Sequence, residues 1–197
     1  MTPSNFTETA LGERNGLPDD LLRLRQAYPR DAWPGHANLG EWTQFWLSRH
    51  GIFRDLDAML TGACEKLQAG QVGIDEFTPW FMPRLEFLFG HLELHHNIEE
   101  FHIFPAFARA EPSLAHGFTL LEADHAAIHV LTDAMQKAAA QLANAGVADA
   151  GQNRRAGDDT ARALAPLLRG LAAHLDDEED LIVPIVLERT EANIGLF

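Results

Sequence analysis

The feature that most constrains the fold is one pattern that occurs twice: a histidine followed by glutamate four residues later and proline ten residues later. The two copies are His95, Glu99, Pro105 and His174, Glu178, Pro184. In an α-helix, residues four apart lie about 40° apart around the axis. Leucines share the same arc in both segments. The histidine and glutamate therefore point toward a core, where an ionised carboxylate needs a partner such as a metal ion.

Two other segments with helical periodicity supply further histidines. His125 and His129 lie one turn apart on an apolar face, a spacing that lets two imidazoles reach one metal ion. His50 lies at the edge of the apolar stripe of an earlier segment. We therefore expect ligands from four separate helices.

The segment around His95 contains three further histidines, at positions 91, 96 and 102. His91 and His102 share the His95 face, so they are second-choice ligands or hydrogen-bond donors to ligands. His96 lies about 100° further round the helix. The recurring spacing therefore favours His95 and Glu99 over the neighbouring pair one residue later.

Together these side chains provide five imidazoles and two carboxylates, enough for two roughly octahedral metal ions. The predicted ligand set is His50, His95, Glu99, His125, His129, His174 and Glu178. If both carboxylates bridge the ions and an oxide or hydroxide adds another bridge, one coordination position stays open for a small ligand. Iron, manganese and zinc all accept such mixed nitrogen and oxygen ligands.

The periodicity predicts four long helices after a proline-containing N-terminal stretch. They span about residues 41–69, 79–110, 113–144 and 159–189. Thr78 and Pro79 resemble an N-cap and a first helical residue. Residues 147–158, small and polar, are typical of a flexible connection.

Because almost no strand pattern is present, the predicted class is all-α, an antiparallel up-down-up-down four-helix bundle. We expect residues 1–40 to form an N-terminal extension on its surface, residues 41–190 the bundle and residues 191–197 a C-terminal tail. Nothing in residues 1–40 indicates chemistry.

Charge and cysteine content exclude several functions. Acidic residues outnumber basic ones 29 to 15, which gives a net charge of −14 and argues against nucleic-acid binding. No apolar run is long enough to span a membrane, and the first residues lack a basic start, so we expect a soluble, cytoplasmic chain. Cys64 is the only cysteine, which excludes an internal disulfide, a thiolate-rich zinc site and an Fe–S cluster. We expect it to be buried rather than reactive.

On these residues the chain resembles a hemerythrin-like (HHE cation-binding) domain over about residues 41–190. The resemblance depends on His50, on the repeated histidine–glutamate–proline pattern and on the histidine pair of the third helix. It implies a non-haem di-iron centre, with the seven ligands given above, that binds dioxygen or nitric oxide. Sensing, storage or a stress response would be its role. The oxygen carriers of this family have an aspartate five residues after the last histidine, where this chain has Glu178 four residues after it.

Two other functions stay open on the sequence alone. A catalytic di-iron carboxylate oxidase of the ferritin-like type uses Glu-x2-His on two helices, a spacing that Glu93 with His96 and Glu122 with His125 also fit. An iron-responsive interaction module would couple metal binding to the order of the bundle. Residues 1–40 would then be the candidate contact for a protein partner, which the sequence does not identify.

Overall fold

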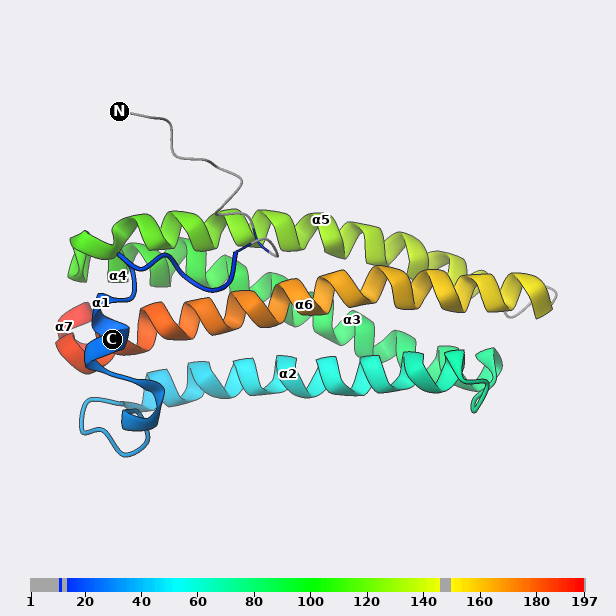
Figure 1. The fold of residues 1–197 in the computed structure, drawn as a ribbon, viewed down its shortest axis with the longest axis horizontal. Helices are drawn as coiled ribbons and strands as arrows, with labels where there is room; N and C mark the ends of the chain where they lie inside the picture. The colour runs from blue at the N-terminus through cyan, green and yellow to red at the C-terminus, as the bar shows by residue number, and fades with distance from the viewer. Residues whose placement is uncertain (1–10, 12–13, 146–149, 197) are drawn as a thin grey trace, which may run out of the picture. The chain divides into compact units, whose positions relative to one another are not determined.

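The computed structural model describes residue 11, residues 14–145 and residues 150–196. Throughout these residues the regular structure is helical and no strand is present, so the predicted all-α class is confirmed (Figure 1). The long helices are α2 (Glu41–Gln68), α3 (Ile74–Ile98), α5 (Ala115–Ala145) and α6 (Ala150–Arg189). The short elements are α1 (Arg23–Ala27), η2 (Arg30–Ala32), η3 (Glu99–Ile103), α4 (Phe104–Ala110), η4 (Pro112–Leu114) and α7 (Glu191–Ile194). No helix in the described part of the chain combines the length and apolarity needed to cross a membrane.

Two predicted helix starts were wrong. Helix α3 begins at Ile74, so Thr78 and Pro79 lie inside it rather than at its N-terminus. The acidic residues Asp75 and Glu76 occupy its first turn, where carboxylates interact favourably with the helix dipole.

Helix α6 begins at Ala150, which makes most of the predicted flexible connection helical. Positions 147–149 of that connection lie outside the described residues. The glycine content of this stretch lowers its helix propensity, but tertiary packing overrides it. At Gly157 an added Cβ would lie 2.9 Å from Leu67 Cδ2, so the missing side chain allows α2 to approach closely.

The chain divides into two compact units, and each long helix contributes residues to both. Unit 1 comprises Met1–Gly51, His95–Ala126 and Ala172–Phe197, and unit 2 comprises Ile52–Leu94 and Ala127–Leu171.

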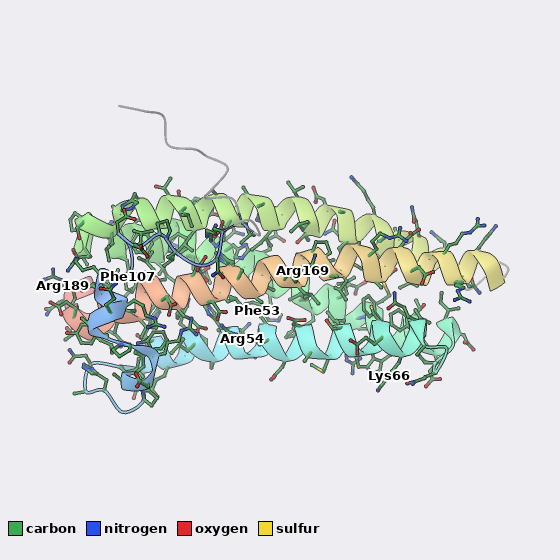
Figure 2. The ribbon with its side chains drawn as sticks, viewed as in Figure 1. Phe53, Arg54, Lys66, Phe107, Arg169 and Arg189 are labelled. Carbon is green, nitrogen blue, oxygen red and sulfur yellow. The ribbon has the colours of Figure 1, made fainter. Side chains whose placement is uncertain are left out.

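Unit 1 has an apolar core to which the N-terminal stretch contributes. Side chains of α4, α5 and α6, among them Phe107, form much of this core (Figure 2). Four buried side chains come from the N-terminal stretch: Leu17, Leu21, Leu24 and Trp33. At Gly117 an added Cβ would lie 2.8 Å from Leu181 and 3.1 Å from Leu21, which shows how closely the stretch packs. Residues 17–33 are therefore part of the core rather than only a surface extension.

Unit 2 has a core that consists almost entirely of apolar side chains. Phe53, labelled in Figure 2, is fully buried there, and the Phe77 and Phe81 rings stack with centroids 4.7 Å apart. Cys64 of α2 is buried in this unit, as predicted.

We expect the Cys64 thiol to be unreactive in the native protein. Burial raises the pKa of this thiol to about 12, so the nucleophilic thiolate is scarce at pH 8. Modification by a disulfide reagent at pH 8 should be much slower for the native protein than for the same protein unfolded in urea. Equal rates in the two states would contradict this prediction.

The C-terminal element α7 contributes an N-terminal cap to α2. Glu191 Oε1 accepts hydrogen bonds from the backbone N–H of Thr43, 2.8 Å away, and from the Thr43 hydroxyl, 2.6 Å away. Both residues are buried. The carboxylate thus satisfies a first-turn N–H that has no partner within the helix.

We therefore expect Glu191→Ala to lower the free energy of unfolding by about 1–2 kcal/mol, the usual cost of losing a cap. Urea denaturation followed by circular dichroism would measure it. Glu86→Ala, at an exposed position of α3, is the matched control and should change stability by less than about 0.5 kcal/mol. Equal stability of the two variants would refute the capping role.

Candidate metal centre

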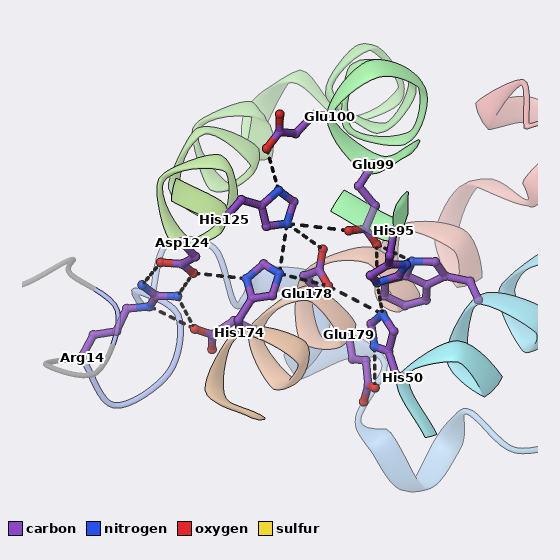
Figure 3. A network of polar contacts seen from close by, with 12 residues as sticks. Arg14, His50, His95, Glu99, Glu100, Asp124, His125, His174, Glu178 and Glu179 are labelled. Carbon is purple, nitrogen blue, oxygen red and sulfur yellow. Dashed lines mark hydrogen bonds and ion pairs between the residues drawn. The ribbon is translucent and has the colours of Figure 1, made fainter. Parts of the chain in front are cut away.

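Seven buried side chains of unit 1 form two groups that could each hold a metal ion, and Figure 3 labels all of them except His96. The donor atoms within each group lie within 4.8 Å of one another. The first, called here the His50 group, consists of His50, His95, Glu99 and Glu178. The second, the His96 group, consists of His96, His125 and His174. These residues come from α2, α3, η3, α5 and α6.

A local change of helical winding positions Glu99. Helix α3 ends at Ile98, and η3 continues it as one π-helical turn before α4. Pro105 follows in the first turn of α4. A proline removes a backbone donor and clashes with the preceding turn of an α-helix, and a wider π turn accommodates both effects. Within this turn the Glu99 side chain is buried.

In the His96 group, two imidazoles face each other through the same type of nitrogen. The Nε2 atoms of His125 and His174 lie 3.1 Å apart. On the far side of each ring, His125 Nδ1 lies 2.8 Å from Glu100 Oε1, and His174 Nδ1 lies 3.5 Å from Asp124 Oδ2. A neutral imidazole whose protonated Nδ1 faces a carboxylate keeps its lone pair on Nε2. Two lone pairs then face each other, an arrangement that a cation between them would stabilise.

The His50 group has a similar organisation, with a carboxylate behind the ring of His50. His50 Nδ1 lies 3.0 Å from Glu179 Oε1, and His50 Nε2 lies 3.1 Å from His95 Nε2. His95 Nε2 is in turn 3.0 Å from Glu99 Oε1. A carboxylate behind the ring fixes the tautomer and orientation of a ligand histidine, as is usual at metal sites.

The two carboxyl groups are buried with few hydrogen-bond donors. Both are fully buried, and Glu99 Oε1 accepts a hydrogen bond of 2.7 Å from the Trp46 indole N–H. Among the described residues, no donor serves Glu99 Oε2 or either oxygen of Glu178. Burial raises the pKa of Glu99 to about 8, against the effect of the Trp46 hydrogen bond. Burial, and then the charge of Glu99, raise the pKa of Glu178 well above its ordinary value. A cation bound to these oxygens would compensate the desolvation.

Burial also keeps the histidines in the form that binds metal. It lowers the pKa of His95 well below the ordinary value, with a further contribution from the neighbouring His50. Burial likewise lowers the pKa of His174, although Asp124 acts in the opposite direction. Both imidazoles are therefore neutral at pH 7, and only a neutral imidazole has a lone pair for a metal.

Each carboxyl group lies close to histidines of both groups. Glu178 Oε2 is 3.6 Å from His50 Nε2 and 3.4 Å from His174 Nε2. Glu99 Oε1 is 3.0 Å from His95 Nε2, while its Oε2 is 3.7 Å from His125 Nε2. The two groups are therefore adjacent, with the carboxyl groups between them.

The structure brings six of the seven predicted ligands into these groups. The exception is His129, whose side chain is exposed on α5 and belongs to neither group. Of the second-choice histidines, His102 is exposed and the ring of His91 lies against Phe87, with centroids 4.0 Å apart.

The predicted ligand set omitted His96, which is 1% exposed. Its ring stacks on that of His125, with centroids 3.8 Å apart and an interplanar angle of 9°. The sequence offered one indication, the adjacent pair of histidines at 95 and 96. The side chains of neighbouring helical residues point in directions about 100° apart. Two adjacent histidines can therefore bind two different ions that lie side by side along the same helix.

A model of the hemerythrin HHE cation binding domain matches residues 43–186. The chain belongs to this family. Residues of both donor groups of this hemerythrin domain lie inside the match, and the resemblance inferred from the sequence is confirmed. Searches among curated proteins and among solved structures gave no significant match. The family thus indicates cation binding, and the geometry shows side chains able to provide it.

We expect His96→Ala to weaken cation binding, whereas His129→Ala should leave it unchanged. Loss of a residue that only orients a ligand costs about 10- to 100-fold in metal affinity. Loss of His96, a direct ligand, should therefore cost more than about tenfold. Equilibrium titration with Co²⁺ would measure both variants. Thermal unfolding of the metal-free forms would check that each variant folds. If His129→Ala weakened binding and His96→Ala did not, the assignment of His96 would be wrong.

Proposed function

We propose that this hemerythrin domain binds two iron ions, one in each donor group, joined by Glu99, Glu178 and an oxide or hydroxide. An open coordination position would accept dioxygen or nitric oxide, and the protein would act in sensing, storage or a stress response. The observation that carries the proposal is the pair of buried carboxyl groups, each within 4 Å of histidines from both groups. Other divalent metals could occupy the same ligands.

The donor set fits two such ions. His96 takes the place that the sequence gave to His129, so five imidazoles and two carboxylates are still available. Three oxygens of Glu99 and Glu178 have no hydrogen-bond donor within the described part of the chain. When these groups ionise on metal binding, the oxygens would supply negative charge where the imidazole lone pairs converge. Iron at such a site supplies redox chemistry and affinity for small diatomic ligands.

The surrounding side chains orient the ligands and exclude water. Trp46 donates its indole N–H to Glu99 Oε1 and places its ring against His50, with centroids 4.0 Å apart. Phe104 lies against His125, with centroids 5.5 Å apart. Both aromatic residues are buried. A dry, preorganised environment strengthens electrostatic attraction between carboxylates and cations.

The antiparallel four-helix arrangement belongs to the same proposal. Long helices α2, α3, α5 and α6 carry the ligands, with Glu99 on η3 at the end of α3. In four-helix bundles, metal sites are built from side chains of facing helices. The number of ligand-bearing helices supports this topology.

The ferritin-like alternative receives less support. Glu93 and Glu122, which it would need as ligands, are exposed and belong to neither donor group. It would also leave His174 and Glu178 without a role, although both are fully buried among other donors.

We expect the 197-residue protein, isolated in air, to contain about two iron atoms per chain and to show oxo-to-iron charge-transfer absorption. Glu178→Gln should abolish the absorption and most of the bound iron. Metal-free Glu178→Gln should be at least as stable as the metal-free wild type. The substitution replaces a buried carboxyl group, whose oxygens receive no hydrogen bond from the described residues, by a neutral amide. Metal analysis, optical spectra and thermal unfolding would test these outcomes.

A double variant, Glu93→Ala with Glu122→Ala, is the control and should retain both iron atoms. Loss of iron in this control would favour the ferritin-like site. If the wild-type protein is isolated without metal and added iron does not change its stability, both the di-iron proposal and the ferritin-like alternative are refuted. Addition of nitric oxide to the reduced, iron-loaded protein should change its visible spectrum, and no change would argue against an open position.

A further inference from the structure

The N-terminal stretch contributes a buried arginine close to the metal centre. The side chain of Arg14 is 5% exposed. Its guanidinium donates to both carboxylate oxygens of Asp124, with Nη1 2.7 Å from Oδ1. It also donates to Asp177 Oδ2 from Nε at 3.0 Å and from Nη2 at 2.6 Å. A planar guanidinium that binds two carboxylates in this way holds both in fixed orientations.

One of these carboxylates lies behind a predicted ligand. Asp124 Oδ2 is 3.5 Å from Nδ1 of His174, which belongs to the His96 group (Figure 3). Arg14, Asp124 and His174 therefore form a continuous polar chain that ends at an imidazole of the centre.

A second arginine of the same stretch makes an equivalent connection to the other group. Arg30 Nη1 lies 3.2 Å from Glu179 Oε2, and its other nitrogens donate to the Asp180 carboxylate at 2.7 Å and the Asp176 carbonyl at 2.9 Å. The remaining oxygen of Glu179 is 3.0 Å from His50 Nδ1. Arg30 is thus tied to α6 by several contacts, and Glu179 connects it to the His50 group.

We propose that Arg14 and Arg30 are positioning residues of the centre, each orienting one histidine ligand of a different donor group through a carboxylate. The N-terminal stretch is then a structural part of the metal centre rather than an appendage. This inference rests on the proposed function, because it concerns binding of cations by the two groups. Loss of outer-shell partners of ligand histidines typically costs 10- to 100-fold in metal affinity.

The coupling works in both directions. If the stretch stabilises the ligands in their binding orientation, bound cations stabilise the docked stretch by the same free energy. Cation binding should therefore lower hydrogen exchange in residues 14–33. The buried side chains Leu21 and Trp33 provide the anchorage that makes such protection measurable.

The first test compares Co²⁺ affinity in three variants of the 197-residue chain. Arg14→Gln and Arg30→Gln should each bind one of the two cations about 10- to 100-fold more weakly. Arg23→Gln is the matched control, because Arg23 lies in the same stretch and contacts Glu111 and Ser113, outside the centre. It should bind like the wild type.

The direction of the change in Co²⁺ affinity distinguishes loss of ligand orientation from loss of a positive charge. Removing a positive charge near a cation would by itself strengthen binding. Unchanged or tighter Co²⁺ binding in both variants would therefore overturn the inference. Arg14→Lys should recover only part of the affinity, since an ammonium group cannot bind two carboxylates as a planar fork.

A spectroscopic readout identifies which ligand moves. In the Co²⁺-loaded protein, the Nδ1–H protons of ligand histidines give strongly shifted proton resonances. Arg14→Gln should displace the His174 resonance and Arg30→Gln that of His50, with Arg23→Gln changing neither. A general loss of stability would not produce this selectivity. Resonances that stay in place in both variants would contradict the inference.

Hydrogen exchange completes the test. In the wild type, Co²⁺ should slow exchange in residues 14–33, and in the Arg14→Gln, Arg30→Gln double variant this protection should disappear. If the wild type binds no cation, the proposed function fails. If it binds two cations and the arginine variants behave like Arg23→Gln, only the present inference fails.

Discussion

The burial of Glu99 and Glu178 without enough hydrogen-bond donors is the constraint on which the structure of unit 1 depends. Three of their four oxygens have no donor among the described residues, and both side chains are fully buried. Protonation, which their raised pKa values indicate, lowers the cost only in part. A bound cation would offset this burial cost more completely, because it would interact with the carboxylate oxygens and with the imidazole lone pairs that converge on the same point. The features that destabilise the metal-free fold are therefore the features that favour metal binding.

The excess of acidic residues has a structural explanation at this centre. Glu100, Asp124 and Glu179 each lie behind a histidine of the donor groups, and Asp177 shares Arg14 with Asp124. Such carboxylates orient the rings and add negative potential where a cation would bind. The net charge of −14 thus reflects, in part, a shell of carboxylates around the two donor groups, some of which pair with Arg14 and Arg30. From composition alone this charge argued only against nucleic-acid binding.

The helix-forming segments and most candidate ligands could be predicted because both depend on local periodicity. The histidine-to-glutamate spacing in α3 and α6 follows directly from 3.6 residues per turn. The choice between His96 and His129 does not, because it requires the rotation of each helix about its own axis. The prediction placed the ligands on the helix face of His95 and therefore left out His96. In the structure both histidines belong to donor groups. The contacts of Arg14 join residues more than a hundred positions apart, which no local pattern encodes.

The distribution of buried polar groups explains why the N-terminal stretch is needed. In the described residues, every buried aspartate, glutamate and histidine belongs to unit 1. Thr160, bonded to the Ala156 carbonyl, is the buried polar residue of unit 2. Unit 2 can therefore be stabilised by apolar burial in the ordinary way. Unit 1 buries charge at its centre and needs additional apolar surface to offset the cost. Leu17, Leu21, Leu24 and Trp33 supply that surface, and the arginines between and beside them supply the counter-charge. The same short stretch thus supplies both the apolar surface and the counter-charge that this buried cluster of charged groups requires.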